Sequence, residues 1–213
     1  RGLVRPGGTL VDADEALASD LSRRLEETMK DLRGAVELLF ATATATARFE
    51  GTGRVDPATA EALGLVAPAA RACGVDQDVR RDHPSGVFRF VHVPVMTAHD
   101  GDVNARAYVR WLEAQRSYEF VRAQLAALPE GSVRNAPKPL RPEHVAVSLV
   151  EGWRGEVAHV AVTGVDGRFS RYKVVDPSFH NWMGLAMALR NEEISDFPLC
   201  NKSFNLSYCG HDL

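Results

Sequence analysis

The chain has 213 residues, of which 45% are hydrophobic and 25% charged, which is ordinary for a folded protein with one large domain or two small ones. Its formal net charge of −3 gives no basic surface for phosphate groups, so nucleic acid is not an expected partner. Three scattered cysteines favour a reducing compartment, the cytoplasm, and no apolar run approaches the roughly 18 to 20 residues that a membrane span needs.

The N-terminal part is predicted to be a turn followed by a long helix. The run Arg5-Pro6-Gly7-Gly8 joins a rigid residue to two permissive ones, which is typical of a turn. Apolar residues recur at three- and four-residue steps over 17–39, which predicts an amphipathic helix capped by Asp12 or Asp14. This helix is either continuous or divided near Gly34.

Shorter elements are expected over 41–81. The alternating segment 41–47 suits a helix or a strand, and we favour the helix. Asp56 and Pro57 supply an N-cap and a first helical residue, so a short helix is expected from there to Gly64. The segment 71–81 alternates charges, which indicates a structured loop with internal ion pairs, and a solvated loop is the preferred interpretation.

The middle of the chain is predicted to be irregular and then helical. Proline and glycine interrupt 82–102, leaving room for one short strand at Val87–Val93. A long helix is expected over 103–128, and a proline-rich connector over 136–142. The apolar side of that helix is expected to carry Tyr108, Leu112, Val121, Leu125 and Leu128.

The last third alternates apolar and polar residues with period two, which predicts strands. The strands are expected at 145–149, 160–162 and 172–174, with Asp166-Gly167 as a hairpin turn between the second and third. A helix over 178–189 then leads into the tail.

The predicted fold class is therefore α+β, mainly helical, with a bundle of long helices and a small antiparallel sheet. The helical part is expected over 1–135, and the sheet, last helix and tail over 143–213. Both are interpreted as one fragment of a larger domain.

No catalytic motif stands out in the residues alone. The seven histidines lack helical ligand spacing, and there is no CxxC pair, phosphate-binding loop or nucleophile elbow. Cys73 is expected to be a buried, inert thiol. Cys200, Cys209, His211 and Asp212 lie close together in the tail, but Cys209 and His211 alone do not make a metal site.

Six motifs nevertheless occur in an informative order. They are RPGG, GxGxV, RACGVDQDVRRDHP, VEGWRGE, DPSFHNW and DFPLCNKSFNLSYCGHDL. Together they resemble the C-terminal portion of the superfamily that unites nickel-iron hydrogenase large subunits with the catalytic-core large subunit of respiratory complex I, the forty-nine kilodalton type. The formate hydrogenlyase and hydrogenase-4 large subunits look most similar.

The resemblance implies that the metal ligands are lost. The family holds its nickel-iron centre with two cysteine pairs, and the first pair would lie upstream of Arg1 in a longer polypeptide. Alignment of 196–198 with the family motif puts the second pair on Ser207 and Gly210, which are poor ligands for nickel. The alternative is an unusual site in which Cys209 and His211 substitute. No metal or cofactor is therefore expected in the fragment.

The resemblance also implies partners and a function. The fragment is expected to be inactive alone and to belong to an electron-transfer oxidoreductase of the formate hydrogenlyase or NADH-quinone oxidoreductase type, with NAD- and quinone-binding relatives. Its expected partners are a small subunit carrying an iron-sulfur cluster, other subunits of a membrane-bound complex, and the upstream part of its own polypeptide. A non-catalytic assembly module for the iron-sulfur subunit is the alternative.

Scaffold residues are carried over from the family's buried site and the interface around it. They are Arg5, Gly7, Gly8, Arg71, Asp78, Arg80, Arg154 and Glu156.

Overall fold

The computed structural model describes residues 3–212. In chain order the elements are β1 (Val4–Arg5), β2 (Gly8–Thr9), α1 (Glu15–Ala41), α2 (Ala43–Phe49), α3 (Pro57–Leu63), α4 (Ala67–Arg71), α5 (Val79–Asp82), the 3-10 helix η1 (Gly86–Arg89), α6 (Val103–Ala126), β3 (Val145–Gly152), β4 (Gly155–Thr163), β5 (Phe169–Val175), α7 (Pro177–Ala188), the 3-10 helix η2 (Ile194–Asp196), α8 (Phe197–Phe204) and α9 (Tyr208–His211). The predicted α+β class is confirmed.

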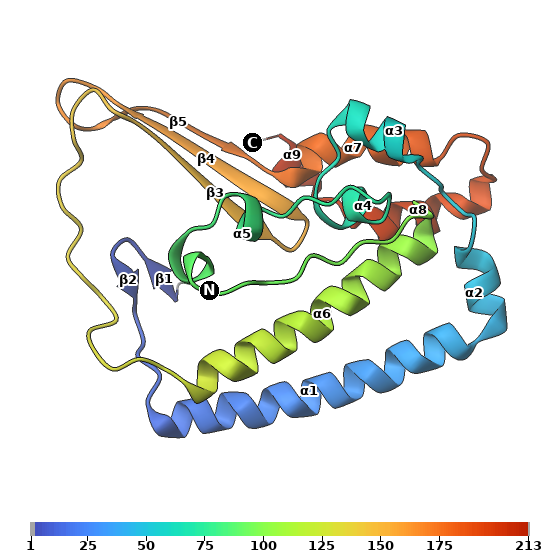
Figure 1. Cartoon of the computed structure of the whole chain (residues 1–213). Helices are drawn as coiled ribbons and strands as arrows, with labels where there is room; N and C mark the ends of the chain where they lie inside the picture. Colours follow the sequence, from blue (N-terminus) through green and yellow to red (C-terminus); the bar gives the residue numbers. More distant parts are fainter. Residues whose placement is uncertain (1–2, 213) are drawn as a thin grey trace.

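Two long helices, α1 and α6, lie side by side along one edge of the molecule (Figure 1). Asp14 accepts a hydrogen bond from Leu17 N and so caps α1, and Asp102 caps α6 in the same way through Ala105 N. Helix α1 continues through Gly34 without a break. Within residues 3–212 no helix combines the length and apolar character required to cross a bilayer.

The core lies where α3, α4, α7 and α8 meet the N-terminal end of α6 (Figure 1). Most of its fully buried side chains are small, which lets these short helices approach closely; it is built around Val55, Ala60, Leu65, Ala69, Ala70, Cys73, Val103, Leu185, Ala188, Cys200, Phe204 and Leu206. The predicted caps of α3 are confirmed, because Asp56 accepts from Thr59 N and Gly64 ends the helix in the left-handed conformation.

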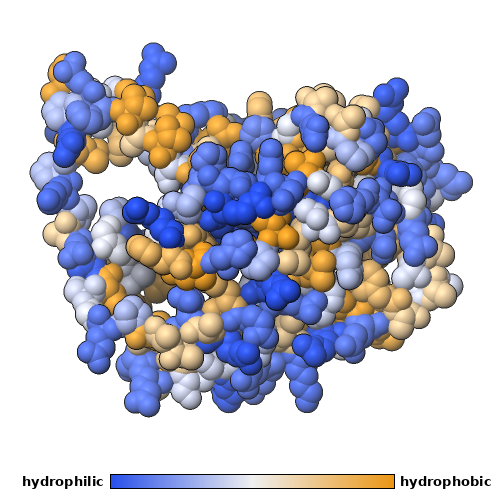
Figure 2. Space-filling model, in the orientation of Figure 1, coloured by the Kyte–Doolittle hydropathy of each residue, from blue (hydrophilic) through white to orange (hydrophobic). Residues whose placement is uncertain are grey.

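The predicted meander is confirmed as an antiparallel sheet in the order β3-β4-β5, with Val147 opposite Val160. Its far end extends away from the helices (Figure 1), and apolar side chains are visible there in Figure 2. Val145 and Val147 of edge strand β3 are 66% and 63% exposed. The end near the helices carries the residues of the candidate site.

One local prediction is wrong. Val87–Val93 forms no strand, because the 3-10 helix η1 covers Gly86–Arg89 and irregular chain follows. The long helix predicted over 103–128 is confirmed as α6, although Tyr108 and Val121 on it are more than a third exposed and Leu128 lies beyond its end. The buried residues of α6 lie at its N-terminal end and include the charged Arg106, because the core contacts this end. Segment 41–47 is helical apart from Thr42, as favoured.

Candidate functional site

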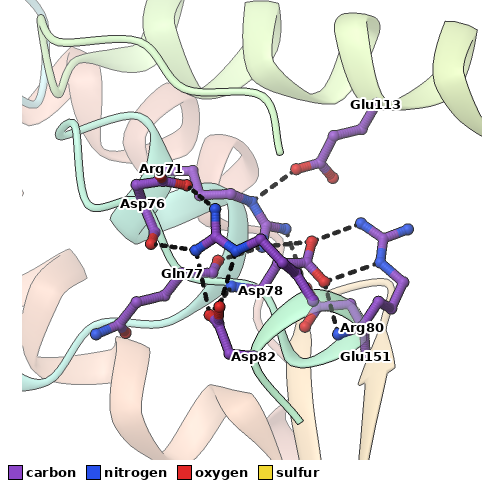
Figure 3. A network of polar contacts seen from close by, with 9 residues as sticks. Arg71, Asp76, Gln77, Asp78, Arg80, Asp82, Glu113 and Glu151 are labelled. Carbon is purple, nitrogen blue, oxygen red and sulfur yellow. Dashed lines mark hydrogen bonds and ion pairs between the residues drawn. The ribbon is translucent and has the colours of Figure 1, made fainter. Parts of the chain in front are cut away.

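The central polar feature is the Arg71 cluster, formed by Arg71, Asp78, Arg80, Glu113 and Glu151 (Figure 3). The Arg71 side chain is only 1% exposed, and its three nitrogens each face a carboxylate. Nε lies 2.7 Å from Glu113 Oε1, Nη1 lies 3.3 Å from Asp78 Oδ2, and Nη2 donates to Glu151 Oε1 at 3.0 Å. The Arg71 guanidinium thus links its own helix, α4, to three other elements. It contacts Asp78 at the N-terminus of α5, Glu113 on α6 and Glu151 on β3.

Arg80 completes the cluster from the other side of Asp78. Its Nε and Nη2 donate to the two Asp78 oxygens at 2.9 and 2.6 Å. Burial by itself would raise the pKa of Asp78, but the hydrogen bonds and charge of Arg80 outweigh it, so this pKa is lowered. The internal ion pairs predicted for 71–81 are confirmed.

The preferred solvated-loop interpretation of 71–81 is wrong, since Arg71 and Asp78 are buried. Arg71 can be buried because Glu113 and Glu151 supply carboxylates to it from α6 and β3. These partners lie far along the chain from Arg71, so the local charge pattern of 71–81 does not show them.

Glu113 and Glu151 give the Arg71 cluster one more carboxyl group than guanidinium groups. Burial raises the pKa of each of these glutamates, although the charge of Arg71 opposes the shift. The cluster opens on one side into a cleft of about 330 Å³, here called the acidic cleft. Its lining consists of Val66, Ala67, Gln77, Asp78, Val79, Asp82, His83, Glu151 and Glu156.

The other scaffold residues lie in two separate parts of the structure. Glu156 lines the acidic cleft, and Arg154, in the turn between β3 and β4, donates from Nε to the carbonyl oxygen of Asn205. The hairpin with Arg5, Gly7 and Gly8 instead contacts the segment just before the predicted connector: Asn135 N donates to Gly7 O at 2.9 Å and Thr9 N donates to Val133 O at 3.1 Å. A Cβ atom on Gly7 would lie 2.0 Å from Asn135 O, so this close approach requires glycine.

Ser207 and Gly210 are both fixed by local packing in the tail. Ser207 Oγ accepts from Gly210 N at 3.0 Å and caps α9. Gly210 is buried against the carboxylate of Asp176, and a Cβ atom on it would lie 2.6 to 2.8 Å from three atoms of that group. Asp176 is itself held as the cap of α7 by Ser178 N at 2.8 Å. The space for a side chain at 210 is therefore filled by Asp176.

All three cysteines are free thiols. Cys73 and Cys200 are buried, and burial raises the pKa of Cys73 to about 11, so its thiol is protonated at neutral pH. Cys209 is exposed and does not line the acidic cleft, and His211 stacks on Phe179. Among residues 3–212 no three His, Cys, Asp or Glu side chains are grouped to hold a metal ion.

Arg106 is a key residue that the sequence predictions missed. Its side chain is inaccessible to solvent and donates to Gly101 O at 2.7 Å, Gly53 O at 2.9 Å and Ser203 Oγ at 2.9 Å. Burial lowers the pKa of Arg106 to about 10, so it stays charged. The sequence feature that could have indicated its burial is its position one turn after Val103, on the buried side of the predicted helix.

Replacing Gly210 by alanine is expected to lower the free energy of unfolding by about 1–3 kcal/mol, because the added methyl group displaces Asp176 and weakens its cap on α7. Urea denaturation measures the change. In an Asp176→Ala background the same substitution is expected to cost at least about 1 kcal/mol less, since the obstructing carboxylate is gone. Equal costs in both backgrounds would show that Asp176 does not limit the space.

Comparisons with known proteins cover nearly the whole chain. Residues 1–144 match the family model described as respiratory-chain NADH dehydrogenase, 49 Kd subunit. The carbon monoxide-induced hydrogenase of Rhodospirillum rubrum is 31% identical over 200 residues, which are 93% of this chain and 55% of the relative. Formate hydrogenlyase subunit 5 of Escherichia coli K12 is 29% identical over 188 residues, or 88% of this chain and 33% of the relative.

A solved structure has the same fold. It belongs to the membrane-bound sulfane sulfur reductase, an archaeal respiratory membrane complex, and superposes with a TM-score of 0.88 at 24% sequence identity. The superposition covers 97% of this chain and 58% of that one. The chain thus spans between a third and somewhat over half of the length of these relatives.

Proposed function

The chain belongs to the family of the 49 kDa subunit of respiratory-chain NADH dehydrogenase, in the superfamily that also contains nickel-iron hydrogenase large subunits, and we propose that it is the C-terminal part of such a subunit in an electron-transfer complex. The resemblance predicted from the six motifs is confirmed at this level. Electron transfer is proposed because similar relatives include hydrogenases and NADH-quinone oxidoreductase subunits D.

The proposed subunit works without a nickel-iron centre of its own. The observation that carries this part is the packing of Gly210 on Asp176, which leaves no room for a thiolate at one of the two expected ligand positions. At the other position Ser207 is engaged as a helix cap. A hard carboxylate and a hydroxyl group do not fit the soft nickel-iron centre, so no chemical step is assigned to that metal.

The proposed partners are a small subunit with an iron-sulfur cluster and further subunits of a membrane-bound complex. They are inferred from the relatives, one of which comes from a respiratory membrane complex. The proposed location is the cytoplasmic side of the membrane, with attachment through those subunits. Arg71 and Arg80 are proposed to hold the fold next to that interface through their ion pairs with Asp78.

Metal analysis of the full-length protein, purified with its partner subunits, tests this proposal. We expect iron from the partner's cluster but well under one nickel per chain, whereas the Rhodospirillum rubrum hydrogenase produced in the same nickel-supplied, maturation-competent host serves as the positive control. Stoichiometric nickel in the purified complex would overturn the loss of the centre.

An assembly role without electron transfer is the second candidate. The exposed valines of edge strand β3 favour it, because apolar side chains on an unpaired edge are suited to contact another subunit. The same preparation separates the two functions. A nickel-free complex that reduces a quinone analogue supports the first, and an intact complex with no such turnover supports the second.

A further inference from the structure

A second cleft, of about 330 Å³, lies between α1, α2, α6, α8 and the β3–β4 turn, and shares no lining residue with the acidic cleft. Its lining is Leu39, Phe49, Val103, Ala107, Arg110, Trp153, Leu199, Lys202, Ser203 and Asn205. Six of these ten residues are apolar, so we call it the apolar cleft. Its volume falls at the small end of the range of roughly 300 to 1,000 Å³ found for small-molecule sites.

The charged residues of the apolar cleft are both cations. Arg110 uses Nη1 and Nη2 to donate to the carbonyl oxygens of Arg106 and Phe204, each at 3.1 Å. Its Nε is buried and has no hydrogen-bond acceptor. Lys202 lies exposed at the rim. Within residues 3–212 neither side chain forms an ion pair with a carboxylate.

Arg110 keeps its positive charge although it is largely buried. Burial lowers the pKa of Arg110 to about 10; the charge of Glu113 opposes this shift, and the smaller effects of Arg71 and Arg154 add to it. Arg110 therefore remains a cation at neutral pH, in a low-dielectric site where an anion is attracted more strongly than in water. Glu113 is already in contact with Arg71.

We propose that the apolar cleft binds a small amphiphilic carboxylate, with its anionic group at Arg110 and Lys202 and its hydrocarbon part against Leu39, Phe49 and Leu199. A neutral apolar ligand leaves both cations without a counter-charge. A strongly hydrated polyanion leaves the apolar wall unused. An apolar chain that ends in one carboxylate satisfies both parts of the lining.

Calorimetric titration of the full-length protein with decanoate tests the proposal, with decanol as the neutral probe and decyltrimethylammonium as the cationic probe of equal chain length. We expect decanoate to bind at least about tenfold more tightly than either, since it alone pairs with the cations. Equal affinity for decanol, or no decanoate binding below its micelle concentration, would overturn the proposal.

Charge reversal at the rim gives the sharper comparison. Lys202 is exposed, so Lys202→Glu is expected to leave the fold intact, to weaken decanoate binding at least about tenfold and to improve binding of decyltrimethylammonium. Arg110→Met is expected to weaken decanoate binding further. Arg122→Met, on the exposed part of α6, is the matched control and should change neither affinity. Unchanged decanoate affinity in Lys202→Glu contradicts the assignment of the anionic group.

Discussion

Replacing Arg71 by methionine is expected to lower the free energy of unfolding by about 3–5 kcal/mol at neutral pH, since it leaves buried carboxyl groups without their cation. Glu113 and Glu151 have no second ion pair with a basic side chain among residues 3–212, whereas Asp78 keeps Arg80. Urea denaturation at pH 7, followed by circular dichroism, measures the loss. A loss below about 1 kcal/mol would show that the two glutamates are solvated rather than buried.

The loss in this variant is also expected to depend on pH. The pKa values of Glu113 and Glu151 are raised in the folded protein, so between the unfolded and folded pKa values the folded state binds more protons than the unfolded state. Stability then falls as the pH rises through that interval. Removing Arg71 raises both pKa values further, so the deficit should be larger at pH 8 than at pH 5.

A neutral version of the glutamates provides the control. In a Glu113→Gln, Glu151→Gln background, Arg71→Met is expected to cost less at pH 7, and its cost should lose most of its dependence on pH. If the stability loss caused by Arg71→Met still depended on pH in this background, groups other than these two carboxyls would be responsible.

Arg106→Met is expected to lower the free energy of unfolding by about 3–5 kcal/mol, because the carbonyl groups of Gly53 and Gly101 lose a buried donor and the methionine cannot replace it. Arg106→Lys is expected to lose less of the free energy of unfolding than Arg106→Met but not to match the original protein, since an ammonium group cannot reproduce three divergent hydrogen bonds. Chemical denaturation measures both variants.

Arg122→Met serves as the control for Arg106 as well, because Arg122 is exposed on the same helix and should change stability by less than about 0.5 kcal/mol. The cost of Arg106→Met should be the same at pH 5 and pH 8, in contrast with Arg71→Met, because its hydrogen-bond acceptors do not titrate. If Arg106→Met lowered the free energy of unfolding no more than Arg122→Met does, water would have to replace the N–H donors of Arg106.

Elements whose signals are local were predictable from the sequence. Asp56 and Gly64 mark the two ends of α3 because each acts within one helical turn, and the period-two pattern places β3, β4 and β5 because alternation is a property of one strand. The strand predicted at Val87–Val93 failed because pairing is not a local property: in the part of the chain that the structure describes, this run belongs to neither sheet.

The candidate site was only partly predictable. The motif resemblance selected Arg71, Asp78 and Arg80, and the charge pattern indicated ion pairs among them. Glu113 and Glu151 come from α6 and β3, so their role depends on tertiary packing that a single sequence does not display. The contact between Asp176 and Gly210 joins residues from two different motifs, so neither motif by itself indicates it.

The reach of Arg106 has a consequence for the order in which the protein folds. Its hydrogen bonds extend 53 residues back to Gly53 and 97 residues forward to Ser203. While the chain is being synthesised, the guanidinium of α6 can complete these bonds only after α8 has left the ribosome. Long-range contacts of this kind slow folding and leave apolar surface uncovered in the meantime. The hydrogen bonds around Arg106 are therefore completed late, once α8 is available to supply Ser203.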